Sequence, residues 1–467
     1  MAVNLNNSSI VKPAEPGAWN GSLTLSELDL IGSIAHVPIV YLYPAPPEKW
    51  LKENDTVFNV LKESLSRALK IFYPLAGRLR WIEGRANVLE LDCNGKGAKF
   101  IEAECESTLD DFHNDQLASL TDQYRNLCPD VDYNIPLQDI PVTLVQATRF
   151  ACGGISLAVS LSHAVLDGQS AFSFISEWAS LTRGEGVKQM PYFDRKCMRA
   201  GEPATVIRDD DPTGFHLSEL LPDHDEEIKS SNGGENAVLP KQKTTMAILK
   251  LGKLDMEKLR EKANNGLCFN ISVADRSYTR FELLAAHVWR CACKARKHEP
   301  EQPTSLGICV DSKRRLNPPL PNGFIGNATF DVTATGISGE LVSKPLGHAV
   351  SIIKATLKKV TSEFIWSAVD YLKYQTDLSM FQSPLPTNRD ESFVYQNPNL
   401  GIISWLGLPM YGQDFGWGKE IDMVLGEIEP GSVVLIPDCN DDGSMVVALR
   451  LQTDHMDSFK NHFYNII

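Results

Sequence analysis

The feature that most constrains the fold is the stretch 201–245, which separates two long segments with regular apolar patterns. It holds acidic runs, paired serines and glycines and several prolines, a composition typical of a long solvated connection. Each flanking segment is long enough to form a large domain. We therefore expect an N-terminal domain at 1–200, a crossover linker at 201–245 and a C-terminal domain at 246–467.

Both predicted domains mix strand and helix patterns. Runs of β-branched and aromatic residues predict strands at 34–43 and 154–162, and apolar residues at helical spacing predict helices at 58–73 and 280–296. Similar patterns predict strands at 140–149, 245–251, 305–311, 327–335, 400–407, 432–437 and 444–452, and helices at 169–182, 254–264, 345–375 and 455–466. Because these elements do not alternate as regular βαβ units, we expect a mixed α/β (α+β) fold and not a doubly wound parallel sheet.

Composition narrows the classes of partner. Among the 467 residues, 45 Lys and Arg stand against 59 Asp and Glu, a formal net charge of −14. This balance argues against nucleic acid, which selects a basic face, and is compatible with a cationic ligand. No run of about 20 apolar residues predicts a membrane span, and residues 1–20 lack the apolar core of a signal peptide. We expect a cytoplasmic protein without nucleic-acid or membrane partners.

Several chemistries are disfavoured because their motifs are absent. The sequence contains no GxGxxG after a strand, no GxxxxGK[ST], no GxSxG and no HExxH. Its ten cysteines form no CxxC pair and have no histidine at a zinc-like spacing. We therefore expect neither a nicotinamide cofactor nor ATP chemistry nor a metal site, and we interpret the cysteines as reduced thiols.

The best candidate for chemistry is the segment SHAVLDG at 162–168. His163 lies where a predicted buried strand ends in a turn, a position from which a side chain can face a cleft. Imidazole is the side chain best matched to proton abstraction near neutral pH. Asp167 could orient the ring, or it could point away and hold the loop. From these residues alone, a capping or core histidine remains an alternative to a catalytic one.

The second candidate is DFGWG at 414–418. Two glycines, Gly416 and Gly418, around an aromatic pair predict a tight turn with buried rings. We interpret this motif, including Asp414, as a structural turn.

Together the two motifs resemble those of the plant acyl-CoA-dependent BAHD acyltransferases. Further segments are similar along the whole length: YPLAGRLR (73–80), FELLAAHVWR (281–290), DSKRRLNPPLPNGFIGN (311–327) and NLGIISWLGLP (399–409). The branch that the chain most resembles is the spermidine hydroxycinnamoyl transferases of plant secondary metabolism, through PAEPGAWNGSLTLSELDLIG (13–32), WRCACKAR (289–296) and SWLGLPMYGQDFGWGKE (404–420).

The resemblance implies a fold and a mechanism. The family fold is similar to two chloramphenicol-acetyltransferase-like domains, joined by a long crossover loop, with a channel between them. His163 would lie in the channel as general base, with a coenzyme A thioester as co-substrate, no other cofactor and no acyl-enzyme. It would take the proton from the acceptor and pass it to the leaving thiolate. Family members are typically monomers.

Supporting roles follow from the same resemblance. Asp167 would point away from the channel and pair with a basic residue of the DSKRR segment, Arg315 in preference to Lys313. The DFGWG turn would be remote from the chemistry. Trp405 would offer its single N–H to the oxyanion of the tetrahedral intermediate, or form part of the channel wall.

One departure from the family pattern concerns the acceptor. Shikimate-using members carry a threonine two residues before this tryptophan, and here that residue is Ile403. They also carry an arginine for the shikimate carboxylate, and here the neighbouring loop holds Asp390 and Glu391, which could equally be exposed surface acids. Carboxylates repel an acidic acceptor and attract a cation. We therefore expect spermidine as acceptor and amides (phenolamides) as products.

Two further expectations concern the pocket for the acyl chain and the other functions that the chain could have. An aromatic acyl chain needs an apolar pocket with a few polar groups. His36 and Tyr41 match family positions near that pocket, although both could also belong to the core of a strand. Two other functions remain: an ester-forming transferase acting on shikimate or quinate, and a non-catalytic relative that binds acyl-CoA.

Overall fold

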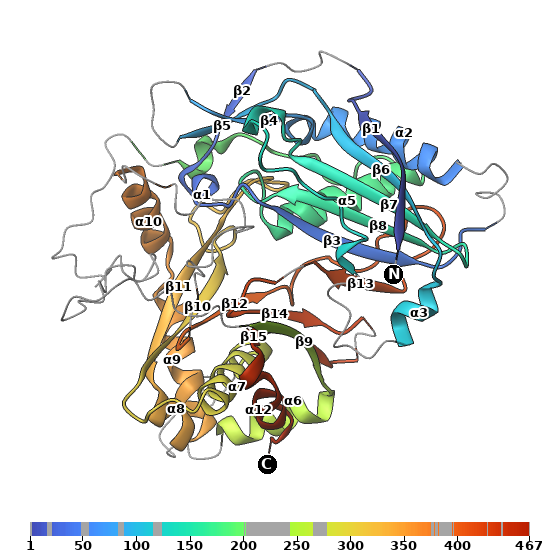
Figure 1. Cartoon of the computed structure of the whole chain (residues 1–467). Helices are drawn as coiled ribbons and strands as arrows, with labels where there is room; N and C mark the ends of the chain where they lie inside the picture. Colours follow the sequence, from blue (N-terminus) through green and yellow to red (C-terminus); the bar gives the residue numbers. More distant parts are fainter. Residues whose placement is uncertain are drawn as a thin grey trace, which may run out of the picture.

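The computed structural model describes most of the chain and arranges it around two large sheets (Figure 1). The described residues are 2–15, 21–47, 56–82, 88–114, 124–199, 201, 243–264, 278–374, 378, 382, 395, 397–426, 428–439 and 442–466. The predicted linker lies almost entirely outside them, as do Asp390 and Glu391.

The N-terminal sheet has the strand order β1-β6-β7-β8-β3-β13. Its strands are β1 (Val3–Val11), β6 (Ala98–Cys105), β7 (Thr143–Phe150), β8 (Ile155–Ser162), β3 (His36–Tyr43) and β13 (Asp422–Leu425). Every residue of β8 is buried because this central strand is covered on both faces. The apolar residues of α2 (Thr56–Ile71) and α5 (Gly168–Thr182) share a core cluster with one face of the sheet.

The C-terminal sheet has the order β11-β10-β12-β14-β15-β9. Its strands are β11 (Thr329–Ile337), β10 (Pro303–Asp311), β12 (Leu400–Ser404), β14 (Ser432–Pro437), β15 (Met445–Gln452) and β9 (Thr244–Leu251). Helices α7 (Arg280–Ala295), α9 (Leu346–Lys359) and α12 (Thr453–Tyr464) share its core and lie along one side of it in Figure 1.

Smaller elements complete the described chain. A three-stranded sheet comprises β2 (Ser22–Thr24), β5 (Leu89–Asp92) and β4 (Arg78–Trp81). The remaining helices are α1 (Glu27–Leu30), α3 (Leu109–Asn114), α6 (Lys253–Asn264), α8 (Ser338–Ser343) and α10 (Ser362–Tyr374), with 3₁₀ turns at Tyr73–Ala76, Leu137–Asp139 and Arg195–Met198.

Local sequence explains where several elements begin and end. The helix predicted at 280–296 is α7, and it begins at a capping box in which Thr279 and Glu282 bond each other's backbone N–H groups. The single helix predicted at 345–375 is wrong. It is two helices, α9 and α10, interrupted at Val360 and Thr361, where the backbone leaves the helical conformation.

One strand of the N-terminal sheet comes from the C-terminal half of the chain. This strand, β13, pairs antiparallel with β3, so that Met423 lies opposite Tyr41. The mixed α/β fold with two sheet-rich domains is confirmed, whereas the predicted boundaries at 200 and 245 stay a prediction. Within the described residues, no helix combines the length and hydropathy that a bilayer-spanning segment needs.

Candidate active site

His163 is the first residue after the central strand β8, and its backbone is held from three sides. Its N–H donates to the carbonyl of Ala35 (2.9 Å), and its own carbonyl accepts from Asn327 Nδ2 (2.7 Å). Gly32 lies so close that a Cβ built on it would be 2.7 Å from the same carbonyl. These contacts join both halves of the chain at this turn and determine where the imidazole lies.

The ring of His163 has no hydrogen-bond partner within the described part of the chain. The residue is half-buried, and neither ring nitrogen is hydrogen-bonded to any residue that the structure describes. Its Nδ1 is itself buried. Buried polar atoms are normally paired, so an unpaired imidazole at the end of a rigid strand is suited to exchange a proton with a bound molecule.

Asp167 does not contact this ring. It caps α5 by accepting from the N–H of Ser170 (2.9 Å), and it also accepts from the N–H of Ala328 (3.1 Å) and from Lys313 Nζ (2.8 Å). Burial would raise the pKa of Asp167, but the ion pair with Lys313 and the hydrogen bonds outweigh it and hold that pKa below its usual range. The carboxylate therefore ties the loop after His163 to the beginning of β11.

The predicted partner of Asp167, Arg315, is wrong. Arg315 Nη1 donates to the carbonyls of Leu357 and Val360, at the end of α9. Lys313, two residues earlier, reaches Asp167 instead. Because Lys313 and Arg315 belong to one turn after β10, the direction of that turn decides between them, and sequence spacing does not.

Trp405 lies beside the same loop. Its ring packs edge-to-face on Phe172 of α5, with centroids 5.3 Å apart. Its Nε1 is 4.0 Å from the place where a Cβ on Gly168 would be. The structure therefore brings this tryptophan, the first residue after β12, to the first turn of the helix that follows His163, and the indole nitrogen lies near that turn.

The structure shows a polar surface on the C-terminal sheet that the sequence motifs do not indicate. Along β11, Phe330, Val332 and Ala334 are buried in the C-terminal core, so Asp331, which alternates with them, lies on the opposite face. Cys309 of β10 is its cross-strand neighbour. The alternation in TFDVTATGI was the available signal, because it puts a carboxylate on a strand face between two threonines.

Tyr395 fills a space that two glycines leave on this surface. Gly307 and Gly401 are paired across β10 and β12, and a Cβ on either would lie 2.2 Å from the Tyr395 ring. The Tyr395 hydroxyl donates to Asp331 Oδ2. Burial raises the pKa of Asp331, against the opposing effects of this hydrogen bond, of Cys309 and of the electrostatic interaction with His163. Asp331 is thus within electrostatic reach of His163.

Ile403 continues the same face of β12. The side chains of Leu400 and Ile402 belong to the C-terminal core, whereas Ile403 is 37% exposed. Ile403 lies on the same face as Gly401, at the border of the polar surface. This position is compatible with its predicted role as an acceptor-binding residue.

The DFGWG motif forms a tight turn packed into the N-terminal core. Asp414 Oδ1 accepts from the N–H groups of Gly416 (2.7 Å) and Gly418 (3.0 Å), and both glycines have φ near +110° (112° and 111°), which favours glycine. The ring of Phe415 is fully buried and meets Trp178 of α5 edge-to-face, with centroids 5.0 Å apart. This geometry is that of a structural turn.

The two predicted acyl-pocket residues have different environments. His36 lies opposite Ser162, and both ring nitrogens are engaged, Nδ1 with the Tyr133 hydroxyl (2.9 Å) and Nε2 with the carbonyl of Pro141 (2.8 Å). Burial lowers the pKa of His36 to about 4, which keeps its ring neutral. Tyr41 is fully buried, and its hydroxyl has no hydrogen-bond partner among the described residues.

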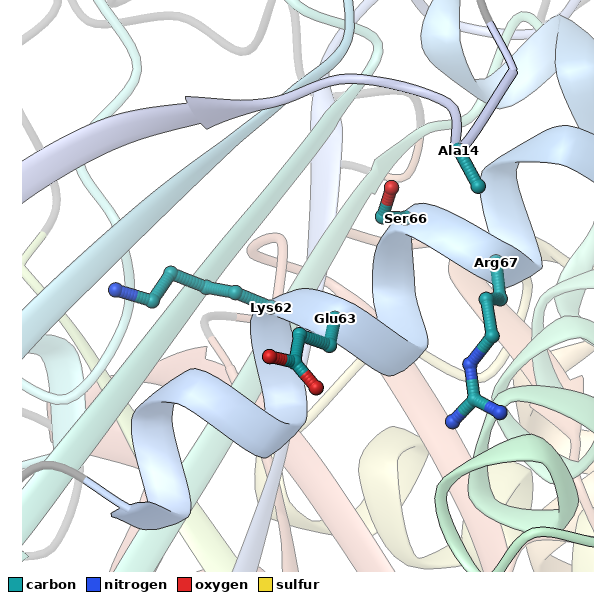
Figure 2. Close-up of a pocket in the computed structure, with 5 residues that line it drawn as sticks. All are labelled: Ala14, Lys62, Glu63, Ser66 and Arg67. Atoms are coloured by element: carbon teal, nitrogen blue, oxygen red, sulfur yellow. The ribbon is translucent and has the colours of Figure 1, made fainter.

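An open depression lies on the surface beside α2 (Figure 2). It is lined by Ala14, Lys62, Glu63, Ser66 and Arg67. Lys62 already pairs with Glu102 (2.8 Å), and Arg67 donates to the carbonyl of Leu181 (2.9 Å). Because its cations are engaged and no reactive group faces it, we do not interpret it as a catalytic site. Among the described residues, no group of histidines, cysteines or carboxylates could hold a metal ion.

Comparison with known proteins relates this arrangement to a family. A family model described as the Transferase family matches residues 1–466. The chain is 41% identical over the full length of both proteins to a hydroxycinnamoyl-CoA:piscidic acid hydroxycinnamoyltransferase of Actaea racemosa. It is 35% identical, again over both full lengths, to a shikimate O-hydroxycinnamoyltransferase of Nicotiana tabacum. A hydroxycinnamoyl-CoA:5-hydroxyanthranilate N-hydroxycinnamoyltransferase of Avena sativa is 34% identical over 98% of this chain and 99% of its own length.

Solved structures support the fold. Vinorine synthase has a TM-score of 0.69 at 22% identity, over 98% of this chain and 96% of that one. The F. graminearum TRI101 structure with ethyl coenzyme A has a TM-score of 0.75 at 18% identity, over 95% and 97%. The architecture expected from the resemblance, that of two chloramphenicol-acetyltransferase-like domains, is therefore confirmed.

Proposed function

Because the chain belongs to the Transferase family, we propose that it transfers a hydroxycinnamoyl group from its coenzyme A thioester to an amine of spermidine, forming an amide. Three relatives, from Actaea racemosa, Nicotiana tabacum and Avena sativa, are named as hydroxycinnamoyltransferases, which supports the acyl donor. We further propose that the enzyme acts as a cytoplasmic monomer and uses no cofactor beyond this co-substrate.

The observation that carries the proposal is the imidazole of His163. It is half-buried, its backbone is held by groups from both halves of the chain, and its nitrogens have no partner among the described residues. A general base needs such a nitrogen within reach of a bound nucleophile. Asp167 and Lys313 keep the loop in place without occupying the ring.

The reaction follows from this position. The lone pair of the acceptor nitrogen attacks the thioester carbonyl carbon, and His163 takes the proton that the nitrogen loses. The Trp405 N–H is the proposed donor to the oxyanion of the tetrahedral intermediate. When the intermediate collapses, the C–S bond breaks and His163 returns the proton to the thiolate of coenzyme A. Placing both substrates at one ring supplies much of the acceleration through proximity.

The acyl chain is proposed to extend toward β3. Tyr41 offers a buried hydroxyl that lacks a partner among the described residues, a suitable polar contact for the tip of a phenolic acyl chain. His36 contributes its ring surface, since both its nitrogens are engaged.

An amine is favoured as acceptor by Asp331, which interacts electrostatically with His163. A carboxylate there attracts an ammonium group and repels an anionic acceptor. The second candidate is ester formation on a hydroxy acid, and it is favoured by the 41% identity to an enzyme named for piscidic acid. Mass spectrometry of the products from a mixed panel of spermidine, shikimate and a hydroxy diacid separates the two.

The decisive variant is His163→Ala. We expect kcat/KM for the thioester and the preferred acceptor to fall at least ~10²-fold, because the base is lost while binding groups remain. Release of free thiol measures turnover, and thermal unfolding checks the fold. His348→Ala on α9, where the ring pairs with Glu340, is the matched control and should keep full activity. Full activity of His163→Ala would end the assignment of this residue as base.

A further inference from the structure

We propose that Asp331, held by Tyr395, binds an ammonium group of the acceptor and so selects a cationic amine. This inference rests on the proposed function and names the residue that would determine its acceptor. Neither residue belongs to a motif of the sequence, and only the folded chain puts the two in contact, within electrostatic reach of His163.

The first argument is that Asp331 has no cationic side chain paired with it among the residues described. Two other deeply placed carboxylates each have one: Asp29 pairs with Arg195 (2.8 Å) and Asp167 with Lys313 (2.8 Å). Asp331 forms no ion pair with any lysine or arginine that the structure describes, and the donors around it are neutral, the Tyr395 hydroxyl and the Cys309 thiol. A partly desolvated carboxylate is costly to keep ionised without a positive partner.

The second argument is that Asp331 remains accessible. The residue is half-buried, and burial nevertheless raises its pKa. A half-buried carboxylate that has lost part of its hydration can still be reached by a small cation. A carboxylate accepts up to about four hydrogen bonds, so one from Tyr395 leaves capacity for an ammonium group.

The third argument is that the pair is built rigidly. Gly307 and Gly401 lie opposite each other on adjacent strands, and the Tyr395 ring occupies the space that side chains would need. The ring presents its hydroxyl to Asp331 Oδ2. Because both glycines leave room for the ring, the Tyr395 hydroxyl is held in place, and it in turn positions the carboxylate of Asp331.

A second carboxylate, the exposed Glu429, interacts electrostatically with Asp331. Glu429 lies in the segment before β14, and desolvation together with the nearby Asp331 raises its pKa. Two carboxylates of this kind match a polyamine, whose nitrogens carry more than one positive charge. One ammonium group would bind at Asp331, and the deprotonated nitrogen of the same molecule would face His163 and attack the thioester.

The test measures spermidine binding separately from turnover. We would titrate spermidine into the wild-type chain by calorimetry, and then into Asp331→Asn, Asp331→Glu and Tyr395→Phe. Loss of a charged hydrogen bond should raise the spermidine Kd about 10- to 100-fold in Asp331→Asn. We expect Asp331→Glu to bind more tightly than Asp331→Asn, and Tyr395→Phe to fall between wild type and Asp331→Asn.

A matched control and a donor measurement exclude general damage. Asp255→Asn removes an exposed carboxylate on α6, beside Lys258, and should leave the Kd unchanged. The KM for the hydroxycinnamoyl thioester should stay within about twofold in every variant, since a uniform loss of fold would raise it too. Thermal unfolding of each variant identifies any that has failed to fold, and Tyr395→Phe then serves in place of Asp331→Asn.

The outcomes separate this inference from the proposed function. Wild-type binding of spermidine that depends on Asp331 supports the inference even if no acyl transfer to spermidine is detected. Equal binding by wild type and Asp331→Asn, or no binding to the wild type, overturns it. Transfer to spermidine with an unchanged KM in Asp331→Asn would leave the proposed function standing and remove Asp331 from the acceptor site.

Discussion

Two ends of one face of the C-terminal sheet behave differently. At the closed end, which we define by Val434, Ile436 and Ala448, the side chains belong to the core cluster of the N-terminal half. At the open end, defined by Asp331 and Ile403, the side chains are half-buried or exposed. The opposite face is apolar at both ends, as Val433 and Val332 show.

The difference shows how one sheet can both join two domains and leave a surface for substrates. Burial of the apolar residues at the closed end releases water, and this stabilises the contact between the two halves. Asp331 and Ile403 at the open end are not covered by that core, so they stay half-buried or exposed. The border between the ends runs between Ile403 and Val434, which are partners in adjacent strands.

We expect the largest effect from Phe415→Ala, because Phe415 belongs to the same core cluster as the residues of the closed end. The ring is fully buried against Trp178 and Tyr43 and attaches the loop before β13 to the N-terminal core. We expect the free energy of unfolding to fall by about 3–5 kcal/mol, the usual cost of removing a buried phenylalanine. Urea unfolding followed by tryptophan fluorescence measures it. Phe415→Leu should lose less, and an unchanged midpoint for Phe415→Ala would contradict the role given to this turn.

The next effect concerns the ion pair that holds the open end to the loop of His163. Lys313→Met leaves the buried carboxylate of Asp167 without its cation, and we expect a loss of about 2–4 kcal/mol in unfolding free energy. Arg315→Met is the matched control. It removes only hydrogen bonds to two carbonyls near the end of α9, and should cost no more than about 1 kcal/mol. Equal losses in both variants would contradict the assignment of Lys313.

The smallest expected effect concerns the border between the two ends, which runs between Ile403 and Val434. Val434→Thr buries a hydroxyl in the N-terminal core and should cost about 1–2 kcal/mol. Ile403→Thr, at the partner position, exposes its hydroxyl to water and should change stability by less than about 0.5 kcal/mol. Thermal unfolding compares the two. Ile403→Thr should instead change the ratio of alcohol to amine products, and equal destabilisation by both substitutions would show that no border exists here.

Much of the architecture was predictable because it depends on local patterns. The strand ending at His163 and the helix after Asp167 follow from apolar runs and apolar spacing, and their positions agree with β8 and α5. The break between α9 and α10 was missed because apolar spacing continues across Val360. The residues of the linker, with Asp390 and Glu391, lie outside the described part of the chain, and their proposed roles stay predictions.

The sequence by itself determined the family, the two-part organisation and the histidine at the end of a buried strand, because motifs and periodicities are properties of neighbouring residues. Only the tertiary structure decided that Lys313 and not Arg315 meets Asp167, and that Tyr395 meets Asp331. Those contacts join residues far apart in the chain, and they depend on strand register and on which face of a strand each side chain takes. A shift of one residue would reverse every such choice.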